Sequence, residues 1–282
     1  MYANKIRWLL LVIAFLLGYT TSAYAVNWRM TLGGHDFIVE QADSHTFGVG
    51  IGVLASHATS SNILLSGRIN TYFDIDNDEL DPDHIPIWFQ SDFLVSGKLA
   101  NLSEQLAMDW FVGLYDRRNT VSSIEKQHKL MPGIDVGLNA KAYEIGVKAS
   151  AGYYFLEIDD DVPRTRGYER GGLRNETSAG SLQLYAGVGL GSSVDLHVFA
   201  QQWHDGDDWL ENKLVVTFAY DANHWLKGGW FGDGQLVLDI EHTEYNLAPY
   251  DNRLADDPDY LPILPWDNDT FVRVFIDFPL SW

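Results

Sequence analysis

The chain ends with the stretch TFVRVFIDFPLSW, residues 270–282. Every second residue of this stretch is apolar, counting back from the end: Trp282, Leu280, Phe278, Ile276, Val274 and Val272. The residues between them are mostly polar or charged, and Pro279 lies near the end, where a missing N–H costs a strand little. Because successive side chains of a strand point to opposite faces, this alternation predicts a terminal strand with one apolar face.

The N-terminus has the sequence features expected of an export signal. Lys5 and Arg7 precede an apolar run over residues 8–18, and Ala23-Tyr24-Ala25 has the small-x-small pattern of a cleavage site. This pattern predicts a signal peptide over residues 1–25, followed by a single domain over 26–282. The alternative is a membrane anchor, but the apolar run is too short and wrongly flanked for a transmembrane helix.

Composition excludes several classes of function. The chain has 19 Lys and Arg against 39 Asp and Glu, a net charge of −20, and it has no cysteine. Such an acidic protein would be repelled by nucleic acid. The lack of cysteine excludes disulfides, a thiol nucleophile and thiolate metal ligands. An acidic water-soluble domain would have the same charge, so charge alone does not assign the fold.

Alternating segments recur along the whole chain after residue 25. We count twelve: 28–40, 45–56, 62–74, 87–100, 105–116, 133–141, 143–157, 181–190, 194–204, 210–221, 234–246 and 270–282. A lipid environment leaves no backbone group unpaired, so strands cross a membrane only as a closed sheet. The sequence therefore predicts an all-β fold, a closed antiparallel up-and-down transmembrane β-barrel of twelve strands.

The connections between these segments alternate in length. With the C-terminus fixed on one side, 57–61, 101–104, 142 and 191–193 are short turns on that side, whereas 222–233 is longer. The opposite side receives 75–86, 117–132, 158–180 and 247–269, together with the short 41–44 and 205–209. Short turns on one side and long loops on the other are typical of membrane barrels. A soluble β-sandwich, the alternative, has no reason to sort its loops in this way.

Tryptophans are expected at the two ends of the strands. Their amphipathic rings favour the membrane interface. The sequence predicts one girdle from Trp28, Trp225, Trp230 and Trp282, and another from Trp88, Trp203, Trp209 and Trp266.

The C-terminal strand, with Phe278, Leu280 and a final Trp282, resembles the assembly signal of Gram-negative outer-membrane β-barrels. The resemblance is to the class and covers the whole chain after residue 25. Twelve-stranded members include small substrate-specific channels, autotransporter-type translocator barrels and a phospholipase. The resemblance implies location in the cell outer membrane, with membrane lipid, lipopolysaccharide and the barrel assembly machinery as partners. Without an N-terminal passenger, at most a solitary autotransporter-like barrel is expected.

Charged residues recur on the parity that would face the barrel interior. This predicted lumen lining comprises Arg68, Asp92, Lys98, Asp109, Asp135, Lys141, Glu144, Lys148, Asp195, Lys213, Asp239, Glu241, Arg273 and Asp277. Acids and bases are close to balance, which disfavours a strongly anion-selective pore. Two interpretations stay open: a paired network that fills the lumen, and the polar lining of a pore.

Acidic residues also concentrate in the predicted outer loops. Asp74, Asp76 and Asp78 have the alternating carboxylates of a calcium loop, but the glycine and the final acid of an EF-hand are missing. The sequence favours solvated loops over a specific metal site. Divalent ions that bridge these carboxylates to lipopolysaccharide are the intermediate case, and no other cofactor is expected.

A catalytic function receives little support. The lipases and deacylases of this class use a His-x-Ser motif, which the chain lacks. His45 and His242 lie on the lipid-facing parity, and Ser44, Glu244 and Thr270 are near enough to complete a hydrolytic site. We nevertheless assign no catalytic residue. The sequence predicts a small passive channel; the alternatives are a structural barrel that binds lipopolysaccharide and, with least support, an outer-leaflet lipid hydrolase.

Overall fold

The computed structural model describes residues 26–39, 44–75, 87–119, 124–158, 174–191, 193–223, 233–246 and 268–280. These residues form twelve strands: β1 (Asn27–Val39), β2 (Ser44–Ala58), β3 (Ile63–Asp74), β4 (Ile87–Asn101), β5 (Leu106–Asn119), β6 (Ile124–Asn139), β7 (Tyr143–Ile158), β8 (Arg174–Leu190), β9 (Val194–His204), β10 (Trp209–Asp221), β11 (Gln235–Tyr245) and β12 (Asn268–Pro279). The predicted signal peptide lies outside the described residues.

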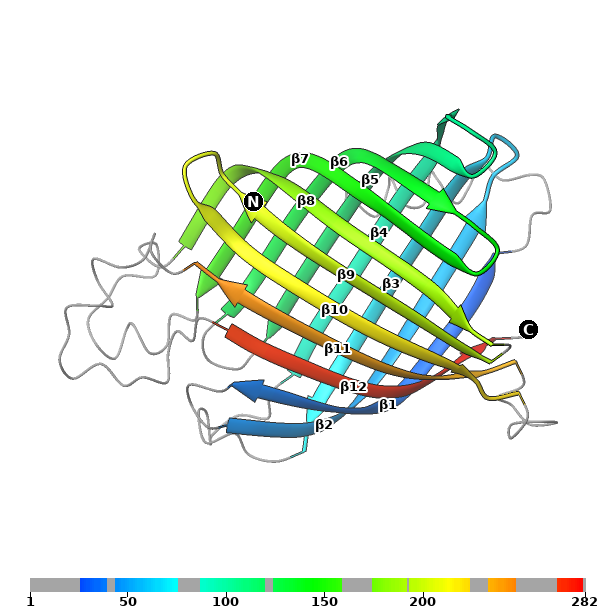
Figure 1. Cartoon of the computed structure of the whole chain (residues 1–282). Coiled ribbons are helices and arrows are strands. Elements are labelled where there is room, and N and C mark those ends of the chain that lie inside the picture. Colours follow the sequence, from blue (N-terminus) through cyan, green and yellow to red (C-terminus); the bar gives the residue numbers. More distant parts are fainter. Residues whose placement is uncertain are drawn as a thin grey trace.

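Each strand pairs antiparallel with its neighbours in the chain, and β12 returns to pair with β1. Figure 1 shows this closure, with blue β1 beside red β12. The predicted closed twelve-stranded up-and-down barrel is therefore confirmed. We call the end with Asn27 and Pro279 the periplasmic end and the opposite end the outer end, as the barrel class implies.

The outside of the barrel is apolar. Large hydrophobic side chains of alternate residues stand on it, among them Leu184 at 58% exposure and Phe47 at 55%. Similar side chains cover neighbouring strands, including Val49, Ile51, Ile69, Phe89, Ile134, Ile145, Leu182, Leu214 and Val274. No water-soluble monomer leaves so large an apolar surface in water, whereas lipid requires one. The described residues contain no helix that is long and apolar enough to cross a membrane.

The sixth strand corrects one prediction. Residues 117–132 were expected to form a long outer loop, but β5 continues to Asn119 and β6 begins at Ile124. The sequence misled because Pro132 interrupts the strand pattern. In the barrel the β6–β7 pairing is broken over Met131 and Pro132, which face Gly152 and Ala151, so the missing N–H of the proline removes no ladder bond to β7. An added Cβ at Gly152 would meet the carbonyl of Leu130 and the Cδ of Pro132, so the close approach requires glycine.

The tryptophan girdles are only partly as expected. Trp28 lies on the outside near the periplasmic end, at 39% exposure. Trp88 and Trp203, predicted at the lipid interface, instead point into the barrel, at 2% and 0% exposure. Their parity on β4 and β9 places them inward, and strand parity takes precedence over the interfacial preference of a single ring. Trp225, Trp230, Trp266 and Trp282 lie outside the described residues.

Candidate functional site

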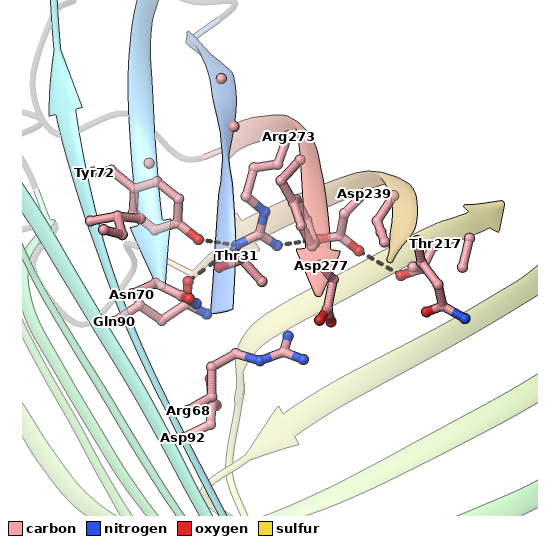
Figure 2. Close-up of a pocket in the computed structure, with 18 of the residues that line it drawn as sticks. Thr31, Arg68, Asn70, Tyr72, Gln90, Asp92, Thr217, Asp239, Arg273 and Asp277 are labelled. Carbon is pink, nitrogen blue, oxygen red and sulfur yellow. Dashed lines mark hydrogen bonds and ion pairs between the residues drawn. The ribbon is translucent and has the colours of Figure 1, made fainter. Parts of the chain in front are cut away.

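The middle of the lumen holds a network around Arg273 of β12. Its Nη1 donates to the Tyr72 hydroxyl at 3.2 Å and to Gln90 Oε1 at 3.1 Å, and its Nη2 donates to Asp239 and, at 2.9 Å, to Glu241 Oε2. Figure 2 shows this guanidinium between β3, β4 and β11. β3 and β4 are neighbours in the sheet, whereas β11 adjoins neither of them. One side chain thus ties β12 and β11 at the seam of the barrel to β3 and β4 across the lumen.

Two further bonds extend this network along β10. Lys213 donates to Glu241 Oε1 at 2.7 Å, and the Thr217 hydroxyl donates to Asp239 Oδ1 at 2.5 Å. Glu241 is therefore shared between two bases, Arg273 and Lys213, and Asp239 between Arg273 and the Thr217 hydroxyl. Charges buried in such a place persist only when they are paired in this way.

Closer to the outer end, a second group of side chains bridges the full width of the lumen. Tyr245 of β11 accepts bonds from Arg117 at 3.4 Å and Gln127 at 3.1 Å, and donates to Asp269 at 3.2 Å. β5 and β11 lie six strands apart in the twelve-stranded ring, so Arg117 and Tyr245 reach each other from opposite walls.

A buried ion pair also lies in the outer half of the lumen, near Tyr245. Lys129 of β6 donates to both carboxylate oxygens of Glu211 of β10 at 2.6 Å, and Tyr154 donates to Glu211 at 3.2 Å. Both charged side chains are almost completely buried. We call Arg117, Gln127, Lys129, Tyr154, Glu211, Tyr245 and Asp269 the bridging layer.

Aromatic and apolar residues pack against the bridging layer on both sides. The Arg117 guanidinium lies 4.6 Å from the centre of the Trp88 ring, and Phe37 and Phe271 stack around that ring. On the other side, Trp203 packs with Tyr154, Leu156 and Leu210. The lumen is therefore narrowest in its outer half.

Two cavities lined by charged, polar and apolar side chains occupy the lumen on the periplasmic side of the bridging layer. The lower cavity, nearer the periplasmic end, has a volume of about 340 Å³. The upper cavity, next to the bridging layer, has a volume of about 370 Å³. They adjoin, because both are lined by the same six residues: Arg68, Gln90, Asp92, Thr217, Asp239 and Arg273. Open space thus continues from the bridging layer toward the periplasmic end.

The structure places the predicted lumen residues as follows. Nine line one or both cavities: Arg68, Asp92, Lys148, Asp195, Lys213, Asp239, Glu241, Arg273 and Asp277. Asp135 and Glu144 make contacts below them, Asp135 with Tyr185 at 2.9 Å and Glu144 with His197 at 3.2 Å. Lys98 and Asp109 are register partners near the periplasmic end, and Lys141 lies in the turn between β6 and β7.

Asp74, the first residue of the suggested metal loop, lies at the end of β3 and points inward. Its carboxylate contacts His35 Nε2 at 2.6 Å and accepts a bond from Trp88 Nε1 at 3.2 Å. Both of its oxygens are thus engaged inside the barrel. Asp76 and Asp78 lie outside the described residues.

Of the predicted C-terminal assembly signal, only part is described. Phe278 is buried, and the backbone N–H of Leu280 donates to the Trp28 carbonyl at 2.9 Å. Trp282 lies outside the described residues.

The two histidines weighed for catalysis lie on the lipid-facing side near the outer end. His242 Nδ1 is 2.9 Å from the Thr270 hydroxyl, and its Nε2 is 3.9 Å from Glu244 Oε1. His45 pairs instead with Asp36, at 3.3 Å. The structure brings Thr270 and Glu244 to His242 and leaves His45 apart from them.

Sequence reasoning missed most of the bridging layer. Arg117, Gln127 and Lys129 fell in the segment taken as a loop, and their inward direction follows only once β6 is known to begin at Ile124. A signal was present, since Gln127 and Lys129 alternate with His128 and Leu130. Cross-lumen partners such as Glu211 and Tyr245 depend on barrel closure, which no local pattern specifies.

No family model matches the chain, and no curated protein matches it. Solved structures are similar at low identity. The "KdgM porin" is 8% identical, with 89% of this chain and 99% of that chain covered and a TM-score of 0.47. The NanC porin is 11% identical (91% and 100% covered, TM-score 0.43), and the outer membrane phospholipase A from Escherichia coli is also 11% identical (92% and 92%, 0.41).

The geometry of the described strands establishes the fold independently of these similarities. A closed ring of twelve antiparallel strands has an apolar exterior and a polar, charged interior. A closed sheet pairs its backbone groups within itself, and an apolar exterior suits lipid rather than water. The chain is a twelve-stranded β-barrel of the outer-membrane class.

Proposed function

We propose that the barrel is a channel for small polar solutes, with the bridging layer as its narrowest part. The observation that carries the proposal is the pair of adjoining cavities with charged and polar residues in their walls, which extend along the lumen below that layer. A barrel built only as a rigid plug would gain stability by filling this space, because close packing is favourable and voids are costly.

The charges on the cavity walls indicate weak ion preference. The acids are Asp92, Asp195, Asp239, Glu241 and Asp277, and the bases are Arg68, Lys129, Lys148, Lys213 and Arg273. With as many acids as bases, the lumen has no strong net field to exclude either sign of ion.

The proposal is tested with the purified barrel in planar bilayers. We expect discrete conductance steps and, across a KCl gradient, a reversal potential close to zero. A bilayer that stays silent over a wide voltage range, although the protein is folded, would overturn the channel proposal. A reversal potential close to the equilibrium potential of K⁺ or of Cl⁻ would contradict the expected weak ion preference.

A second candidate function rests on a separate observation, the His242–Thr270 contact at 2.9 Å on the lipid-facing side. A hydroxyl within hydrogen-bond distance of a histidine whose other nitrogen faces a carboxylate is the arrangement of a hydrolytic site. We rank this function second, because His242 and Thr270 are also direct partners across β11 and β12, where such a bond forms without catalysis.

The lipid hydrolase is tested with fluorescent phospholipid in mixed micelles. Thr270→Val and His242→Ala are compared with His45→Ala, which removes a histidine at the same end of the barrel. Activity in the parent that only the first two variants lose would support an enzyme. Absence of hydrolysis in the parent, or equal activity in all variants, contradicts one.

A further inference from the structure

Arg68 is a positively charged residue in the wall of the lower cavity. It extends from β3 into the open space below the Arg273 network, as Figure 2 shows. Its guanidinium makes no hydrogen bond or ion pair with any residue that the structure describes, unlike Arg273 and Arg29, which bond to Asp239 and Asp277. Its register partner on β4 is Asp92, which lines the same cavity but forms no ion pair with it, so the guanidinium N–H groups are open to an anionic group.

The opposite wall carries a negatively charged residue, Asp195. Asp195 lies on β9, which is six strands from β3 in the closed ring, and it lines the same cavity as Arg68. Within the described part of the chain, its carboxylate has no hydrogen-bond or ion-pair partner either. Free charges of opposite sign therefore face each other across a cavity of about 340 Å³.

The same cavity is also lined by neutral hydrogen-bonding groups and by the paired charges Asp239, Arg273 and Asp277. The neutral groups are the side chains of Asn70, Gln90, Thr31 and Thr217. Glycines at positions 33, 34 and 50 also line the cavity, and their lack of a side chain leaves space in it. At Gly50 an added Cβ would come within 2.7 Å of the Tyr72 ring, so the glycine leaves room for inward side chains. Ala219, Val237 and Phe275 also line the cavity, so the space accepts a small polar molecule that carries a short apolar group.

We propose that the lower cavity is a binding site for small zwitterions, of which free α-amino acids are the natural class. The solute carboxylate binds Arg68, its ammonium group binds on the Asp195 side, and the transverse field between the two walls orients it. An anion without a cationic group would meet Asp195 on the opposite wall, and a cation without an anionic group would meet Arg68. This inference deepens the proposed channel function by naming the solute class.

The test measures swelling of proteoliposomes in isosmotic L-alanine and in isosmotic glycerol, which is similar in size but uncharged. The parent is expected to favour alanine. Arg68→Gln and Asp195→Asn should each lower the alanine-to-glycerol ratio, with roughly tenfold weaker alanine binding, as expected when a hydrogen bond to a charged group is lost. Lys98→Gln, a lumen-parity lysine that lines neither cavity, should leave the ratio unchanged.

A charge-exchanged variant, Arg68→Asp with Asp195→Arg, separates the proposal from general damage. A free zwitterion can bind in the reverse direction, so the preference for alanine should return. Saturable binding of alanine to the detergent-solubilised barrel is measured in parallel by calorimetry.

The outcomes distinguish this inference from the channel itself. Glycerol swelling without any preference for alanine, and no saturable alanine binding, would leave a channel but overturn the zwitterion site. Saturable binding that Arg68→Gln abolishes, in a barrel that passes neither solute, would support the site and contradict the channel.

Discussion

At the scale of single residues, the lumen shows how a barrel holds charge. Lys129 and Glu211 are buried, and each depends on the other across four strands. Burying one such charge alone is expensive, whereas a pair with good geometry can persist. The contacts within the bridging layer therefore stabilise the barrel only as complete sets.

We expect Lys129→Met to lower the free energy of unfolding by about 3–5 kcal/mol, because it leaves the Glu211 carboxylate buried without a cation. The double variant Lys129→Met with Glu211→Leu should recover most of this loss, since two apolar groups replace both charges. Urea unfolding in lipid vesicles measures both values. Equal stability of the single and double variants would contradict a coupled pair.

The turn between β9 and β10 supplies a pH-dependent contact. Asp205 accepts backbone N–H bonds from Asp208 at 2.9 Å and Asp207 at 3.0 Å, and these bonds lower the pKa of its carboxyl group. A lowered pKa in the folded state means that the contribution to stability is present above the ordinary value near 3.9. It is lost as the pH falls through the lowered pKa.

Hydrogen exchange of the Asp207 and Asp208 amides should therefore become faster at acid pH than the intrinsic exchange rate alone explains. Asp205→Asn keeps an acceptor oxygen but does not titrate, so its protection factors should stay constant over the same pH range. Protection that is independent of pH in the parent would show that the carboxylate does not hold the turn.

At the scale of strands, close backbone approach decides where glycine is needed. The β6–β7 contact at Gly152 leaves no room for a Cβ beside the Leu130 carbonyl, whereas Gly180 on β8 has its nearest obstacle at 3.6 Å. We expect Gly152→Ala to destabilise the barrel by about 1–3 kcal/mol, the usual cost of overpacking. Gly180→Ala should change stability far less. Thermal unfolding of the two variants checks the difference, and an equal effect would contradict it.

The strands also show what could be predicted from sequence. Alternation over residues 62–74 and 143–157 predicted β3 and β7 well, because an apolar lipid side and a polar lumen side give a period of two. β6 and the start of β8 were predicted short, since Pro132 and the polar residues 174–180 hide the pattern. The partners of the bridging layer needed the register of the whole ring.

At the scale of the molecule, the lumen divides into two parts. The outer half is crossed by the bridging layer, and the lower part keeps open space with balanced charge. A solute path in this barrel must therefore pass or displace the bridging layer. Tyr245 is the point at which Arg117, Gln127 and Asp269 meet.

The most direct measurement is the single-channel conductance of the Tyr245→Ala barrel against that of the parent, with Tyr143→Ala as a control on the lipid-facing side. We predict small steps in the parent and the Tyr143 variant, and clearly larger steps in the Tyr245 variant, because the narrowest part of the lumen is widened. Equal conductance in all three would show that the bridging layer does not limit the path. A parent that is silent while the Tyr245 variant conducts would contradict a channel and establish a plugged barrel.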